Sequence, residues 1–151
     1  MSVKVLATNR KARHEYFLLD TYEAGIALLG SEIKSIRAGQ ISIKEAYVRV
    51  DMGEAWLVEA HVAPYDQANR NNHEPRRPRK LLLHKKEIQR LGDGVRKKGA
   101  TIIPTRVYLK DGRAKVEIAL ARGKRNFDKR QAIAARDAQR EIERQMSKRD
   151  Y

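Results

Sequence analysis

The pair Asp111-Gly112 constrains the fold of this chain more than any other short segment. It lies between residues 101–109 and 114–121, and both stretches alternate between apolar and other side chains. An Asp-Gly pair between alternating strands indicates a β-hairpin, because both central residues of the favoured turn need a positive φ. We therefore expect an antiparallel pair of strands here, within a larger sheet.

Two more hairpins are predicted upstream. Residues 45–50 alternate between apolar and other side chains, and residues 55–63, after a turn-forming segment, are again strand-like. Residues 14–20 and 25–29 are apolar, rich in aromatic or branched side chains, and separated by four residues that suit a turn. Six or seven short strands in hairpins favour a mainly β fold with short helices, for which a closed or partly open barrel of the oligonucleotide-binding (OB) type is the leading candidate.

A short helix is expected over residues 31–37. Ile33 and Ile36 are three apart, Ser31 is a plausible N-cap and Gly39 a stop, so that Lys34 and Arg37 face outward.

A second helix is expected over residues 85–98. It has Ile88, Leu91 and Val95 on one face and an interruption near Gly92 and Gly94. Residues 66–80, with two prolines and four arginines, predict an exposed loop, and residues 81–83 predict core.

Charge is concentrated in two segments. The chain has 33 Lys and Arg against 19 Asp and Glu, a formal charge of +14 over 151 residues. Residues 70–98 contain 11 basic and 3 acidic side chains, and residues 122–151 contain 10 and 5. Segregated positive charge favours binding of a polyanion, with nucleic acid first and an anionic membrane surface second. An ordinary basic enzyme is the alternative.

Composition excludes several kinds of chemistry. The absence of cysteine excludes thiolate zinc sites, iron–sulfur clusters, disulfides and a Cys nucleophile. The four histidines lack metal-ligand spacing, and no phosphate-binding glycine loop or GxSxG motif is present. We expect no catalytic site, metal or cofactor. With no signal peptide and no apolar run of about 20 residues, a cytoplasmic protein is expected, with no membrane association.

Residues 128–148 form a different kind of segment. Arg136, Arg140, Arg144 and Lys148 recur every four positions, which gives a basic stripe on a helix with little apolar surface to bury. We expect an OB-type barrel over residues 1–122 and a basic tail over residues 123–151. The tail is expected to be disordered when free and to become helical on its partner. The alternative is a helix docked on its own barrel.

Five segments in order resemble the small protein B family, the tmRNA-binding (SsrA-binding) proteins of bacterial trans-translation. They are NRKARHEY from Asn9, EAGIAL from Glu23, GSEIKSIRAG from Gly30, NHEPRRPRKLLLHKKEI from Asn72 and GKRNFDKR from Gly123. The resemblance implies a non-enzymatic adaptor whose OB-type barrel binds the tRNA-like domain of tmRNA. It also implies entry into the A site of stalled ribosomes, with the tail in the empty mRNA channel.

Residue by residue, the resemblance and the charge pattern predict two sets of contacts. The RNA-binding set is Asn9, Arg10, Lys11, Arg13, His14, Glu23, Lys34, Arg37, Lys80, Leu82 and Lys115. The decoding-centre and tail set is Gly123, Lys124, Arg125, Phe127, Asp128, Lys129, Arg130, Arg136, Arg140, Arg144 and Met146. Lys and Arg suit phosphates, and Glu23 suits a base or ribose donor. Some relatives have His where this chain has Phe127, which removes side-chain hydrogen bonding there.

The implied partners are tmRNA and the small-subunit ribosomal RNA at the decoding centre and mRNA channel. Elongation factor Tu and alanyl-tRNA synthetase are expected to act indirectly through tmRNA, on a monomer of this chain in the complex. Two other functions stay open on the residues alone. One is a generic ribosomal-RNA-binding or ribosome-assembly protein, and the other is an RNA-processing enzyme that uses His14 and Glu23.

Overall fold

Nine strands and three helices occupy the part of the chain that the computed structural model describes, residues 3–65 and 72–124. In chain order they are β1 (Val3–Thr8), α1 (Arg10–Glu15), β2 (Tyr16–Ile26), α2 (Gly30–Arg37), β3 (Ile41–Ser42), β4 (Tyr47–Asp51), β5 (Glu54–Val58), β6 (His61–Val62), β7 (Arg79–Leu82), α3 (Lys85–Lys98), β8 (Thr101–Lys110) and β9 (Arg113–Gly123). The basic tail, residues 125–151, lies outside the described residues.

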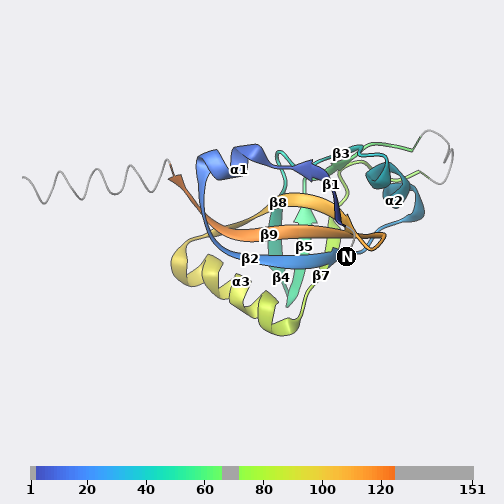
Figure 1. Ribbon diagram of the computed structural model, residues 1–151. Helices are drawn as coiled ribbons and strands as arrows, with labels where there is room; N and C mark the ends of the chain where they lie inside the picture. Colours follow the sequence, from blue (N-terminus) through green and yellow to red (C-terminus); the bar gives the residue numbers. More distant parts are fainter. Residues whose placement is uncertain (1–2, 66–71, 125–151) are drawn as a thin grey trace, which may run out of the picture.

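The main sheet closes on itself. Its strand order is β1-β8-β4-β5-β7-β2-β9, and β8 also pairs with β9, so that six strands form a barrel and β1 extends it beside β8. All pairings are antiparallel. In Figure 1, β2, β9 and β8 form the near wall and β4, β5 and β7 the far wall, with α3 across one end. The expected mainly β barrel with short helices is confirmed.

Alternate residues of the barrel strands point inward and form the core. Leu57, Leu81, Ile102, Val116 and Ile118 are each at most 1% exposed. Because side chains alternate across a strand, the neighbours of these residues point to the outer wall. Some of them, such as Lys80 and Leu82 beside Leu81, are exposed there, whereas Ile103 and Ala119 are covered.

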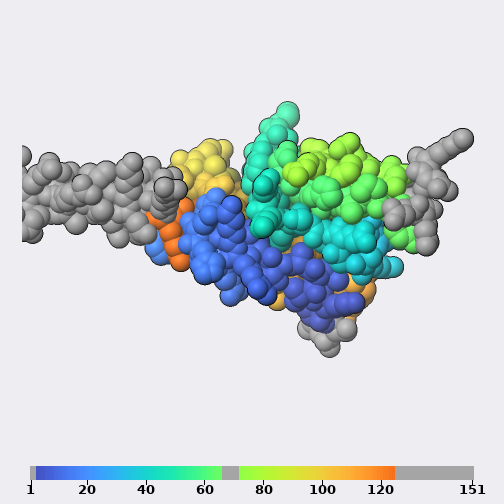
Figure 2. Space-filling model, turned by 90° about the horizontal axis from the view of Figure 1, so that it is seen from above, coloured from blue at the N-terminus to red at the C-terminus, as the bar shows by residue number. Residues whose placement is uncertain are grey.

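Both predicted C-terminal strands are present. β8 and β9 pair from Lys110↔Arg113 at the turn, where Asp111 and Gly112 have φ of 51° and 80°. The predicted hairpin at 45–63 is present as β4 and β5, but its second strand ends at Val58. β6 leaves the barrel and pairs instead with β3 in a separate two-stranded sheet. The tip of the β4–β5 hairpin stands clear of the surrounding surface in Figure 2, where Met52 is 96% exposed.

The hairpin predicted for residues 14–29 is wrong. One strand, β2, runs through the supposed turn and pairs with β9 from Tyr16↔Gly123 to Gly25↔Lys115. The four residues read as a turn, 21–24, pair with β9 in continuous register, and the one register shift of this pairing lies before them, between Leu18 and Thr21. Strand β1 and helix α1 were not predicted.

The two longer helices lie where predicted. α2 ends before Gly39, whose φ is +75°, and Lys34 and Arg37 are exposed as expected. α3 is continuous, so the predicted interruption is wrong. Gly94 lets it approach the barrel, because a Cβ there would lie 2.8 Å from the Leu120 methyl groups. Within the described ranges, no helix has the length and hydropathy needed to cross a membrane.

Candidate RNA interface

A groove of about 640 Å³ lies on the outer wall between β2, β7 and the start of α3. It unites four residues of the predicted RNA-binding set that are distant in sequence: Glu23, Lys80, Leu82 and Lys115. The strand register explains the meeting, because Gly25 pairs with Leu82 on one side and with Lys115 on the other. We call this site the Glu23 groove.

Glu23 is held as an oriented carboxylate. The buried Tyr108 hydroxyl donates a hydrogen bond to Glu23 Oε2, and Lys110 Nζ lies 3.4 Å from Oε1. The hydrogen bond from Tyr108 is the main reason that the pKa of Glu23 lies below its ordinary value. Burial and the same hydrogen bond raise the pKa of Tyr108. Because the Glu23 side chain is 40% exposed, the carboxylate retains acceptor capacity for a ligand.

Three side chains complete the groove. Leu82 is 55% exposed, and the missing side chain of Gly25 makes room for it, since a Cβ there would lie 3.2 Å from Leu82 Cβ. Lys80 Nζ lies 3.4 Å from Glu54 Oε1, with both side chains 45% exposed. An exposed pair of this kind is weak, so Lys80 can exchange its carboxylate for a phosphate. Residues 81–83 were predicted as core, but only Leu81 is buried, whereas Leu82 is exposed and Leu83 is half-buried.

Helix α1 and its N-cap hold five other predicted residues, away from the Glu23 groove. Arg10, Lys11, Arg13 and His14 are exposed on it. Asn9 is 7% exposed and faces inward. Its Oδ1 accepts from the Ala12 amide at 3.2 Å, and its Nδ2 donates to the Pro104 carbonyl at 3.1 Å. Asn9 therefore caps α1 and ties it to β8, rather than presenting its amide to a ligand.

Helix α2 holds Lys34 and Arg37 beyond the other end of the long strands (Figure 1). Lys34 Nζ lies 5.5 Å from the centre of the Tyr65 ring, and Arg37 Nη2 donates to the Gly112 carbonyl at 3.3 Å. Both remain exposed to solvent. The structure thus places the predicted cations in three separate groups, on α1, on α2 and in the groove.

Of the predicted tail set, two residues are described. Gly123 pairs with Tyr16, and Lys124 Nζ donates to the Arg13 carbonyl at 2.9 Å. The other nine lie outside the described residues: Arg125, Phe127, Asp128, Lys129, Arg130, Arg136, Arg140, Arg144 and Met146.

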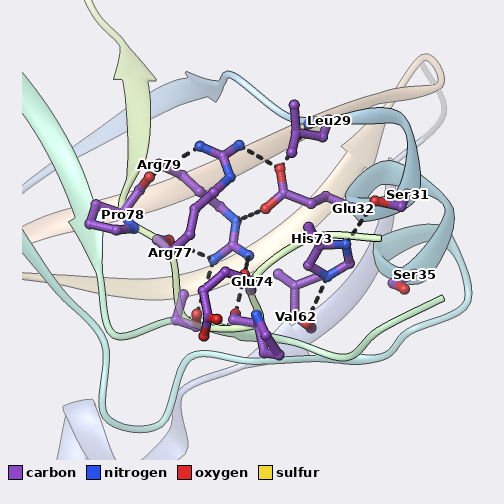
Figure 3. Close-up of polar contacts among 12 residues, drawn as sticks. Leu29, Ser31, Glu32, Ser35, Val62, His73, Glu74, Arg77, Pro78 and Arg79 are labelled. Carbon is purple, nitrogen blue, oxygen red and sulfur yellow. Dashed lines mark hydrogen bonds and ion pairs between the residues drawn. The ribbon is translucent and has the colours of Figure 1, made fainter. Parts of the chain in front are cut away.

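The loop predicted to be wholly exposed contains a buried arginine. Residues 66–71 of it lie outside the described ranges, but Arg79, its penultimate residue, is 0% exposed and begins β7. Figure 3 shows its guanidinium against the carboxylate of Glu32 from α2, which Arg77 also meets at 2.5 Å. Burial alone would raise the pKa of Glu32, but hydrogen bonds from Arg77, the Leu29 amide and Arg79 lower it.

Arg79 also satisfies backbone groups of the loop. Its Nη atoms donate to the carbonyls of Ala60, Pro75 and Arg77 at 3.0–3.1 Å. Beside it, the buried His73 donates from Nε2 to the Val62 carbonyl at 2.9 Å and accepts from the Ser31 hydroxyl at 2.8 Å. These contacts hold the proline-rich loop to α2 and set the start of β7, from which Lys80 and Leu82 enter the groove.

The family model described as "SmpB protein" matches residues 6–148. This chain belongs to the SmpB family.

Solved and curated relatives agree with this family. The chain is 60% identical over 141 residues to the "SsrA-binding protein" of Desulforudis audaxviator (strain MP104C), covering 93% of this chain and 92% of that one. It is 59% identical over 147 residues to the "SsrA-binding protein" of Roseiflexus sp. (strain RS-1), covering 97% and 93%. A solved chain described as "tmRNA-SmpB: a journey to the center of the bacterial ribosome" matches with a TM-score of 0.66 and 49% identity, over 78% of this chain and 83% of that chain.

In this SmpB family member, sequence reasoning missed several groove residues. They are Glu54, His84 and Lys85, which line the groove, and Tyr108 and Lys110, which hold Glu23. A signal for Tyr108 was present, because counting back from the Asp-Gly turn places it opposite Lys115. No such signal existed for Glu54, since its approach to Lys80 depends on the pairing of β5 with β7.

Proposed function

We propose that this chain is a tmRNA-binding adaptor of trans-translation that acts on ribosomes. Its membership of the SmpB family gives the class of function, and one observation supports it in this chain. The groove brings Glu23, Lys80, Leu82 and Lys115 together on an outer wall, although 92 positions separate the first from the last.

The chemistry of the groove suits folded RNA. Lys80 and Lys115 meet phosphates, while Glu23, ionised and oriented by Tyr108, accepts from an amino group of a base or from a ribose hydroxyl. Leu82 provides apolar contact with a base or sugar. Phosphate contacts supply affinity that salt weakens, whereas Glu23 supplies discrimination that salt weakens less.

The finer assignments extend this proposal. The groove is assigned to the tRNA-like domain of tmRNA, with α1 and α2 meeting further phosphates. Residues 1–122 form the RNA-binding barrel, and residues 123–151 act at the decoding centre and in the mRNA channel of the small subunit. Elongation factor Tu and alanyl-tRNA synthetase act through tmRNA, the chain works in the cytoplasm as a monomer, and it serves as an adaptor rather than a catalyst.

The test compares tmRNA with an unrelated structured RNA of equal length, each bound to the full chain across a salt series. A specific adaptor keeps a large preference for tmRNA at physiological salt. Loss of both RNAs together as salt rises would contradict the proposal and favour a generic ribosomal-RNA-binding protein, because counterion release would then dominate.

A truncation tests the division between barrel and tail. Removal of residues 123–151 is expected to retain tmRNA binding and to abolish peptide tagging in a reconstituted translation system. Loss of tmRNA affinity in the truncated chain would contradict this division.

A further inference from the structure

The outer wall of β4, β5 and β7 has an aromatic residue between two cations. Strand register pairs Arg49 of β4 with Trp56 of β5, and Trp56 in turn with Lys80 of β7. Directly paired side chains on one face of a sheet lie within contact range of each other. Arg49 and Lys80 are exposed and Trp56 is partly exposed, so the row faces solvent.

A second aromatic ring lies next to this row. Tyr47 is two residues before Arg49 on β4, hence on the same face, and is 40% exposed. It borders two hollows, a polar one of about 340 Å³ beside α1 and a mainly apolar one of about 240 Å³ beside the end of α3. Arg49 and Arg96 line the second hollow, and no acidic side chain does.

The cations of this surface are available to a ligand. Within residues 3–65 and 72–124, Arg49 forms no ion pair. Lys80 has only its half-exposed contact with Glu54. Partly exposed aromatic rings beside exposed cations are the arrangement that binds single-stranded nucleic acid, where rings stack on bases and cations follow the phosphates. A duplex would not suit it, because paired bases hide their faces.

We propose that the outer wall formed by Tyr47, Arg49, Trp56 and Lys80, the Trp56 face, binds an unpaired segment of RNA. A base stacks on Trp56, a neighbouring base packs against Tyr47, and Arg49 and Lys80 meet the flanking phosphates. The inference rests on the proposed function for its class of ligand. It adds a second contact surface, which adjoins the Glu23 groove at Lys80 and extends away from it across β5 and β4.

Trp56 is the sole tryptophan of the chain, so its fluorescence reports on this face alone. The experiment titrates the full chain with a short unstructured oligoribonucleotide. Saturable quenching is expected, since a stacked base lies against the indole. By polarisation of the labelled oligonucleotide, Trp56→Leu is expected to weaken binding about tenfold, and Trp56→Tyr to restore most of the affinity.

A charge variant guards against misfolding of the Trp56 variants. Arg49→Gln changes an exposed side chain and is expected to lower the slope of log K against log salt by about 0.7. Its matched control is Arg113→Gln, which removes an equal charge from the exposed β8–β9 turn and is expected to leave oligonucleotide affinity within about twofold of the original.

The outcomes separate this proposal from the function on which it rests. If tmRNA binds but the oligonucleotide leaves Trp56 fluorescence unchanged, the Trp56 face does not bind RNA and the adaptor function stands. Equal effects of Arg49→Gln and Arg113→Gln would also overturn the proposal. If neither tmRNA nor the oligonucleotide binds, the proposed function itself fails.

Discussion

Glu32 and Glu23 are both bound by side-chain donors that are distant in sequence, yet they differ in how much of the carboxylate stays open to solvent. The Glu32 side chain is 0% exposed and its two oxygens take bonds from Arg77, Arg79 and the Leu29 amide. Glu23 takes bonds from Tyr108 and Lys110 but remains 40% exposed. The proposed binding role of Glu23 therefore depends on its unused acceptor capacity, because both carboxylates have a charged partner and only that of Glu23 is open to a ligand.

Two clusters are linked through β7: the Glu32 cluster, which is Glu32 with Arg77 and Arg79, and the Glu23 cluster, which is Glu23 with Tyr108 and Lys110. The Glu32 cluster fixes the loop that leads into β7, and β7 presents Lys80 and Leu82 beside Glu23. A change in the first cluster should therefore alter stability, whereas a change in the second should alter affinity at constant stability.

The largest effect is expected for Arg79→Met. It removes the fully buried cation beside Glu32, leaving Arg77 and the Leu29 amide as its donors, and frees several carbonyls, which should cost about 3–5 kcal/mol of unfolding free energy in urea titrations. Arg79→Lys keeps the charge but not the several N–H donors of the guanidinium. Its unfolding free energy is expected to lie between those of the original chain and of Arg79→Met. A loss no larger than that of an exposed pair, such as removal of Arg76 from Glu59, would contradict the assigned role.

Glu23→Gln should lower affinity for tmRNA and leave stability unchanged, the reverse of the effect expected for Arg79→Met. Loss of a charged acceptor is expected to weaken tmRNA binding about 10–100-fold while leaving the urea midpoint nearly unchanged. Glu59→Gln is the matched control, since Glu59 is 48% exposed and its cation, Arg76, also lies 3.4 Å away. Equal affinities for the two variants would remove Glu23 from the binding site.

The pH dependence of stability should follow Glu32 more than Glu23. Folding holds the pKa of Glu32 below its ordinary value of 4.5, so its stabilisation is complete above that value and is lost as pH falls through the folded pKa. Urea midpoints between about pH 6 and about pH 3 should therefore fall, and fall less steeply in Glu32→Gln. An identical slope in Glu32→Gln would show that other carboxylates dominate acid unfolding.

The smallest effect is expected for Tyr108→Phe. The substitution keeps the buried ring and removes the hydroxyl that orients Glu23, so tmRNA affinity should fall about three- to tenfold. The Glu23→Gln, Tyr108→Phe double variant should then be no weaker than Glu23→Gln alone, because Tyr108 acts through Glu23. Additive losses would mean that Tyr108 meets RNA by another route.

Turns and helices were predicted from the sequence more accurately than the pairing of strands that are distant in the chain. The Asp111-Gly112 turn and the end of α2 before Gly39 were found because such residues act within a few positions, although the N-cap of α2 is Leu29 and not the predicted Ser31. The supposed turn in β2 failed because pairing with β9 along its length overrides a local break in alternation. Arg79 was placed in an exposed loop because its burial depends on Glu32, which lies 47 residues earlier.

The site was predicted in part for the same reason. Cations and Glu23 came from the family resemblance and charge pattern, but their separation into three groups could not be read from spacing. Asn9 was counted as a contact, and its inward direction follows from Ile43 and Pro104, which no sequence pattern connects to it.

Strand β2 has a further consequence as a spacer. It joins Glu23 in the groove to Tyr16, which pairs with Gly123 where the chain leaves the barrel. Seven residues of extended strand span at most about 23 Å. Because β2 is braced by β9 along this length, that separation is set by a rigid element and not by a linker. The barrel thus sets a fixed distance between the groove proposed to bind RNA and the point where residues 125–151 begin.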